Sequence, residues 1–320
     1  MQTTVVGSYP KIPNLPRPAR LRQAIARHER GQLSVDELAE IEGEVTAEVI
    51  KEQIEAGIDI VSDGQIRWDD DQTYLMRHWQ GVEIGGLQRY LDTNTYFREP
   101  EIKGPLAAGE PVLGKDYRFA AARCARPIKA IVPGPYTLAA LSKDEHYGNR
   151  RDLTLAIAEL LTPEVADLEQ AGAPIIQINE PLILRHPGDI SVLREALARM
   201  LSGVSAETAL YTWFGTITPE LLDLPVDTIG VDLVSKPGNW NVLRQARPQK
   251  KIGLGIIDGR NTRLESSEEI AASVRRALEF CDPDSAYVNP SCGLEYLPRE
   301  VAFEKLRRLV AGARLAQSKD

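Results

Sequence analysis

The sequence contains only three cysteines among its 320 residues, at Cys124, Cys281 and Cys292. An odd and sparse set of this kind cannot form a disulfide framework, so it favours a reducing compartment. No stretch approaches 18 consecutive apolar residues, and the first residues lack a basic segment followed by an apolar one. These absences argue against a transmembrane helix and against a signal peptide, so the sequence predicts a cytoplasmic protein with no membrane partner.

Basic residues are also in deficit, with 38 Lys and Arg against 46 Asp and Glu and a net charge of −8. Because no basic run stands out, binding to a phosphate backbone is excluded as the main task, and nucleic acid is not an expected partner. The glycines match neither G-x-G-x-x-G nor the P-loop, so a dinucleotide or ATP site has no support. No paired spacing of His and Cys occurs, so any zinc site would have to be assembled from separated donors.

The chain is instead rich in short β-branched runs that alternate with longer amphipathic stretches. Several runs are apolar at nearly every position, as parallel strands buried on both faces require. The predicted strands are residues 3–8, 58–64, 128–134, 174–181, 209–215, 227–234, 251–258 and 285–292, and the clearest helices between them are 33–57, 153–172, 266–280 and 298–315. This order predicts an α/β chain folded as a single (β/α)8 TIM barrel, with residues 82–127 inserted as a hairpin plus helix between strands two and three.

In such a barrel the functional site lies at the carboxyl ends of the strands. Many polar and aromatic side chains stand at those ends, and burying so many polar groups would be costly without a ligand or partners. The pattern therefore predicts a small-molecule site. Its candidate residues are Ser8, Lys11, Gln65, Arg67, Trp68, Asn179, Glu180, Trp213, Asp232, Asp258, Arg260, Asn261, Asn289 and Cys292.

Cys292, in the phrase "YVNPSCGLEYLP", allows three interpretations from the residues alone. A zinc site needs about four ligands, and only single donors such as His146 and His186, in loops after strands three and four, could join it. A nucleophilic thiol needs a base or a helix N-terminus, yet the next helix begins near Pro298. An ordinary packed side chain is the third interpretation.

Eight phrases in order, "VVGSYP", "DIVSDGQIRWDD", "PGPYT", "QINEP", "YTWFG", "GVDLV", "GIIDGRNTR" and "VNPSCGL", resemble the cobalamin-independent methionine synthase family across almost the whole chain. The resemblance implies a methyltransferase built on one barrel or on a fused pair. In that family the catalytic barrel holds a zinc ion that activates the thiol of homocysteine for attack on a methylfolate, and single-barrel relatives use other donors, including methylcorrinoids.

The resemblance carries over unevenly onto the residues of this chain. Gly7 and Ser8 match the segment that holds the amino-acid substrate, and Cys292 matches the last zinc-binding cysteine, while Asp232 replaces a zinc-binding glutamate. This chain departs from the family's pattern at three further places. Gln65 replaces a glutamate, Asn179 replaces an aspartate, and Tyr211, Thr212 and Trp213 replace a His-x-Cys pair. Several phrases resemble the zinc-free N-terminal barrel of the fused enzyme more closely.

Three hypotheses follow. The first is a methyltransferase component that transfers a methyl group from a methylfolate or methylcorrinoid to a thiol such as homocysteine, with a zinc-bearing methionine synthase barrel as its partner protein. The second is an autonomous zinc enzyme that uses Cys292, Asp232 and a loop histidine such as His186. The third is a non-catalytic protein that binds folate or an amino acid. Under the first two, Gln65 and Asn179 would hydrogen-bond the substrate without adding negative charge.

Overall fold

The computed structural model describes residues 1–15 and 19–318, and these form two compact units. The first unit contains Met1–Arg67, Phe119–Lys129 and Val231–Asp320, and the second contains Trp68–Arg118 and Ala130–Gly230. The chain passes between them several times, so neither unit is one continuous segment.

Parallel strands form the centre of the first unit. Strand β1 (Gln2–Thr3) pairs with β10 (Ala286–Pro290), which pairs with β9 (Lys251–Ile257), and β9 neighbours the end of β8 (Thr228–Asp232). Two parallel bridges, Thr4 with Ile60 and Val61 with Ile128, continue the same direction on the other side of β1. The carboxyl ends of all these strands therefore point the same way.

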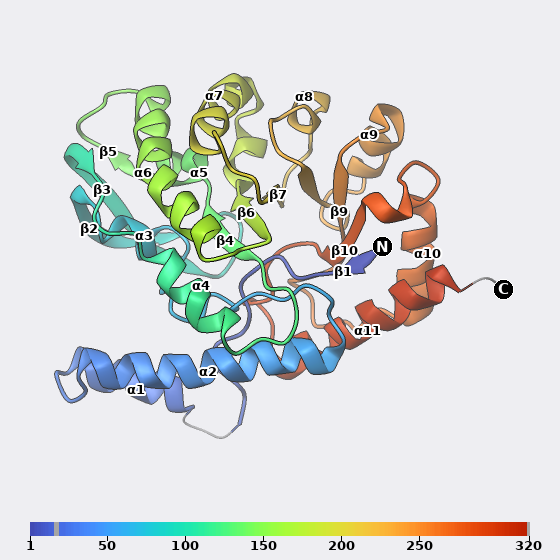
Figure 1. Cartoon of the computed structure of the whole chain (residues 1–320), viewed down its shortest axis with the longest axis horizontal. Helices are drawn as coiled ribbons and strands as arrows, with labels where there is room; N and C mark the ends of the chain where they lie inside the picture. The colour runs from blue at the N-terminus through green and yellow to red at the C-terminus, as the bar shows by residue number, and fades with distance from the viewer. Residues whose placement is uncertain (16–18, 319–320) are drawn as a thin grey trace. The chain divides into compact units, whose positions relative to one another are not determined.

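The helices of the first unit begin and end where local sequence signals place them. Ser34 and Ser266 each cap a helix through a capping box with the glutamate three residues later, and Gly57 ends the first of these helices in the left-handed conformation. Helix α1 lies along α2, and α10 packs against α11 (Figure 1). The helices are α1 (Arg20–Glu29), α2 (Val35–Ala56), α9 (Asn239–Ala246), α10 (Ser267–Ala277), the short η3 (Pro283–Ser285) and α11 (Arg299–Gln317).

The second unit contains three more parallel strands in the order β4, β6, β7. All residues of β6 are buried, as its run of apolar residues predicts for a strand covered on both faces. The strands are β4 (Ala130–Pro133), β6 (Ile175–Asn179) and β7 (Glu207–Thr212). The helices are α3 (Thr73–Met76), α5 (Pro135–Ala140), α6 (Arg150–Gln170), η1 (Pro181–Arg185), η2 (Pro187–Asp189), α7 (Ile190–Met200) and α8 (Pro219–Leu222).

The segment predicted as an insertion contains a hairpin followed by a helix. Strand β2 (Gln80–Arg89) pairs antiparallel with β3 (Tyr96–Ala107), β3 pairs with the short β5 (Lys143–Asp144), and α4 (Leu113–Ala121) follows the hairpin. Each of the eight predicted strand runs contains strand or bridge residues. The single-domain organisation stays a prediction. Within residues 1–15 and 19–318, no helix has both the length and the apolar character needed to cross a membrane.

Candidate functional site

Cys292 lies just after β10, completely buried. Its Sγ donates to the carbonyl oxygen of Gly293 at 3.3 Å. Burial raises the pKa of the thiol well above its usual value, and the nearby carboxylates of Glu295, Asp232 and Asp258 raise it further. A thiol with so high a pKa stays protonated at neutral pH, so Cys292 is not an activated nucleophile.

Ser8, after β1, meets the loop that follows Cys292. Its hydroxyl donates a hydrogen bond to Oε2 of Glu295, and its carbonyl oxygen accepts the N–H of Leu294 at 2.9 Å. Burial raises the pKa of Glu295, whereas the Ser8 bond and the nearby Lys11 ammonium lower it. A Cβ atom on Gly293 would lie 2.0 Å from Ser8 Oγ, so only glycine allows this close approach. Ser8, Lys11 and Glu295 thus place a hydroxyl, a cation and a carboxylate together.

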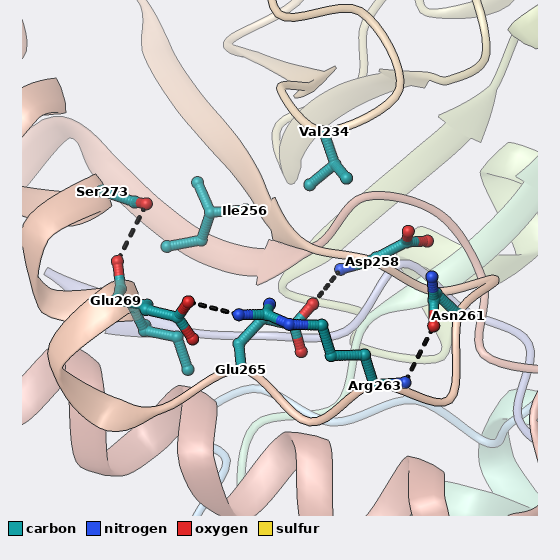
Figure 2. Close-up of a pocket in the computed structure, with 9 residues that line it drawn as sticks. Val234, Ile256, Asp258, Asn261, Arg263, Glu265, Glu269 and Ser273 are labelled. Carbon is teal, nitrogen blue, oxygen red and sulfur yellow. Dashed lines mark hydrogen bonds and ion pairs between the residues drawn. The ribbon is translucent and has the colours of Figure 1, made fainter.

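A tight turn follows β9. The carboxylate of Asp258 accepts the N–H of Arg260, and the side-chain oxygen of Asn261 accepts the N–H of Arg263, both at 2.9 Å. The turn borders a cavity of about 270 Å³, shown in Figure 2. Its lining residues are Val234, Ile256, Asp258, Asn261, Arg263, Glu265, Glu269, Ile270 and Ser273. Arg263 pairs with Glu269, and the side chains of both residues remain exposed to solvent.

The other predicted residues of the first unit are held by the protein itself. The carbonyl of Gly7 accepts the Ser62 hydroxyl at 2.7 Å, and Asn289 donates to the carbonyl of Pro290 at 2.8 Å. Gln65 is buried with a φ of +52°, a left-handed conformation that costs energy outside glycine. The Arg67 guanidinium lies 4.2 Å from the centre of the Phe119 ring, a cation–π contact.

Glu180, in the second unit, caps a short helix. Its two carboxylate oxygens accept the N–H groups of Tyr136 and Thr137 at 2.8 and 2.9 Å and the Thr137 hydroxyl at 2.7 Å, at the N-terminus of α5. A Cβ on Gly134 would lie 2.1 Å from the Glu180 carboxyl carbon. Burial raises the pKa of Glu180 to about 7, against the opposing effect of these hydrogen bonds. Its contacts give Glu180 a clear structural role.

The remaining predicted residues of the second unit are buried. Trp68 stacks on Tyr74 with 5.3 Å between ring centres, and Asn179 accepts a hydrogen bond from Gln177 at 2.7 Å. Tyr211 packs so tightly against Gly230 that a Cβ there would lie 2.2 Å from its ring. Trp213 is 4% exposed, and its indole N–H has no hydrogen-bond partner among the described residues. Trp213 therefore offers a buried donor that a ligand could satisfy.

Residues 1–315 match the family model described as the catalytic domain of cobalamin-independent synthase. The chain belongs to the cobalamin-independent methionine synthase family. It is 32% identical to the methionine synthase of Saccharolobus solfataricus over 324 aligned positions, which cover 99% of this chain and 95% of the relative. The methionine synthase of Sulfurisphaera tokodaii is also 32% identical, with 99% and 93% covered. These findings confirm the predicted enzyme class, a methyltransferase of the methionine synthase kind.

Solved structures of this family have the same fold. A B12-independent methionine synthase from a Shewanella species, in complex with selenomethionine, superposes with a TM-score of 0.85 at 27% identity, covering 98% of this chain and 97% of that one. A putative vitamin-B12 independent methionine synthase from Listeria monocytogenes superposes with a TM-score of 0.78 at 18% identity and full coverage of this chain, which shows the fold alone. The matches confirm the predicted fold class, an α/β barrel.

The zinc site of the methionine synthase family does not fit the residues of this chain. Oδ1 of Asp232 accepts the N–H groups of Val234 and Ser235, both at 2.9 Å, and Oδ2 accepts the Ser235 hydroxyl. Three donors therefore already occupy the carboxylate, and the Cys292 Sγ already donates to the carbonyl oxygen of Gly293. The described residues include no group of three or more His, Cys, Asp or Glu that could hold a metal ion. The indole N–H of Trp213 is a donor and cannot replace the lost cysteine ligand.

Sequence reasoning missed Glu295, although it stands three residues after Cys292 in the phrase "SCGLE". An acidic residue so close to the end of a strand is itself a signal for a site residue in a barrel, although Cys292 is the candidate predicted in this phrase. In the structure Glu295 accepts the hydrogen bond of Ser8, and the Lys11 ammonium lies near enough to lower its pKa.

Proposed function

We propose that this chain transfers a methyl group from a methylfolate or a methylcorrinoid to the thiol of homocysteine, and that a zinc-bearing barrel of the same family serves as its partner. In this reaction a bond forms between the substrate sulfur and the methyl carbon. The bond from the methyl carbon to the donor breaks and its electron pair stays with the donor, while the thiol proton ends on the demethylated folate nitrogen or, with a methylcorrinoid donor, in solvent.

The observation that carries the amino-acid part of the proposal is the cluster of Ser8, Lys11 and Glu295. Homocysteine is a zwitterion. Its ammonium is complementary to the carboxylate of Glu295, and its carboxylate is complementary to the ammonium of Lys11. Glu295, held by the Ser8 hydroxyl, would accept hydrogen bonds from the substrate ammonium, while Lys11 would bind the substrate carboxylate. The Shewanella relative binds selenomethionine, an analogue of methionine, which supports an amino-acid ligand in this family.

The partner is proposed because the chain does not supply the family's zinc ligands itself. Only Cys292 and Asp232 remain of that set, and the protein already satisfies both. The residues of this chain would bind and orient the amino acid. Orientation of this kind accounts for a large part of enzymatic rate enhancement.

Replacing Ser8 by alanine tests the proposal. The change removes the hydroxyl that fixes Glu295 and leaves the backbone contact with Leu294 in place. In an assay of methionine formation with both donors and the partner barrel supplied, we expect KM for homocysteine to rise about tenfold with a smaller change in kcat. Ser202→Ala, at an exposed position after α7, is the control and should leave both constants unchanged. Wild-type protein that forms no methionine with either donor would contradict the proposed function.

A further inference from the structure

Lys305 is a buried cation on α11, and its side chain is 0% exposed. Its ammonium donates to the carbonyl oxygen of Arg263 at 2.6 Å and to Oε2 of Glu265 at 2.7 Å. A lysine that is buried and charged is rare unless it is paired, because the loss of hydration must be offset. Both of its partners belong to the segment that follows β9, so Lys305 fixes that segment to α11.

Glu265 also bonds to the start of the turn that runs from Asp258 to Glu265. Its other oxygen, Oε1, accepts the backbone N–H of Asp258 at 3.0 Å, as Figure 2 shows. Arg308, one turn further along α11, donates to the carbonyl oxygens of Leu264 and Glu265 at 3.3 and 3.2 Å. Both ends of the turn from Asp258 to Glu265 are therefore fixed to one buried ion pair.

The turn also covers the thiol of Cys292. The N–H of Gly259 donates to the hydroxyl of Ser291 at 3.2 Å. A Cβ on Gly259 would lie 2.7 Å from Cys292 Sγ and 2.9 Å from the carbonyl oxygen of Gly293. The turn backbone and the Cys292 loop are thus in direct contact, so the turn is part of what covers the thiol.

We propose that Lys305 and Glu265 are positioning residues: their buried pair sets the turn after β9, which holds Asp258 in place and keeps Cys292 covered. The pair touches no reacting atom in this arrangement and acts through Asp258 and Gly259. Its effect on methyl transfer rests on the proposed function, whereas its effect on the cover over Cys292 does not.

The chain offers a matched control for the general loss of a buried ion pair. Arg299 lies at the start of the same helix, is 5% exposed and pairs with Glu52 at 2.9 Å, on α2 rather than on the turn. Lys305→Met and Arg299→Met therefore each remove one buried cation from α11. Only the first removes a contact with the turn.

The experiment measures the rate at which a thiol reagent modifies Cys292 in protein carrying Cys124→Ser and Cys281→Ala, at several urea concentrations below the unfolding transition. For Lys305→Met we expect modification at least about tenfold faster without urea and with almost no dependence on urea, the sign of local opening. For Arg299→Met we expect a rate that rises steeply with urea, as global unfolding requires. Glu265→Gln, which keeps an acceptor for the Asp258 N–H, gives the same test if Lys305→Met does not fold.

Equal behaviour of the Lys305 and Arg299 variants, or rates that follow global unfolding in both, would overturn the proposal. A second readout is the homocysteine KM, which should rise in Lys305→Met and stay at the wild-type value in Arg299→Met. If the labelling results agree with expectation while no variant or wild-type protein forms methionine, the positioning role stands and the proposed function fails.

Discussion

Gly293→Ala should lower kcat/KM for homocysteine about a hundredfold. The added Cβ would lie 2.0 Å from Ser8 Oγ and 2.1 Å from Glu295 Oε2, far inside normal contact distance. The hydrogen bond between these two side chains must therefore break, and the carboxylate proposed to bind the substrate ammonium loses the hydroxyl that fixes it. Steady-state kinetics of methionine formation, with the partner barrel present, would measure the loss.

Gly104→Ala is the control, because no atom lies within 4 Å of a Cβ at that position. Glu295 is only partly buried, so its side chain can turn outward and the fold should survive the Gly293 change. An alanine variant at Gly293 that keeps wild-type kcat/KM would show that the Ser8 and Glu295 pair is not part of the amino-acid site.

Glu180→Gln should change how stability depends on pH. Burial raises the pKa of Glu180 to about 7 in the folded protein, from an ordinary value of 4.5 when unfolded. Between these values the folded state binds a proton that the unfolded state releases, so the free energy of unfolding falls as pH rises. The shift corresponds to about 3 kcal/mol lost between pH 4 and pH 8.

Glutamine cannot titrate, so this part of the pH dependence should disappear in the variant. The free energies of unfolding of wild type and variant, measured in urea at each pH, give a difference in which the other titrating groups cancel. We expect this difference to move by about 3 kcal/mol in favour of glutamine from pH 4 to pH 8. A constant difference across the window would mean that the Glu180 carboxyl titrates at its ordinary pKa.

The strands were predictable because buried parallel strands need nearly continuous apolar runs, and the run before Asn179 is buried at every position. Helix starts were equally accessible where a capping box is written in the sequence, as at Ser266 and Glu269. The end of that helix was less certain, since it stops at Ala277 although apolar residues continue to Phe280. Local signals therefore determine where elements lie but fix their ends less closely.

The contacts of the candidate site could not be predicted from the sequence. The strand-end rule makes Ser8 a candidate, yet its partner Glu295 stands 287 residues later, and no local pattern joins the two. The same rule placed Glu180 among substrate-binding residues, while its oxygens bind the N-terminus of α5. Lys305 carries no sequence signal at all, because a helical lysine is normally exposed and its burial depends on tertiary packing.

The comparison with the methionine synthase family sharpens the question about metal. Membership in the family brings the expectation of zinc, whereas Asp232 already accepts three hydrogen bonds and the described residues include no group of three His, Cys, Asp or Glu that could hold a metal ion. A site that binds and orients the amino acid without holding zinc accounts for both observations. The chemistry that zinc supplies to the thiol would then come from the partner barrel.

Methionine formation from homocysteine by the zinc-stripped chain is the most direct measurement of this account. It should be made with a methylfolate and with a methylcorrinoid, first with the chain alone and then with a zinc-loaded barrel of the same family. The account predicts no turnover by the chain alone, and turnover when both proteins are present that falls with Ser8→Ala of this chain. Turnover of about 1 s⁻¹ or more by the stripped chain alone would contradict it.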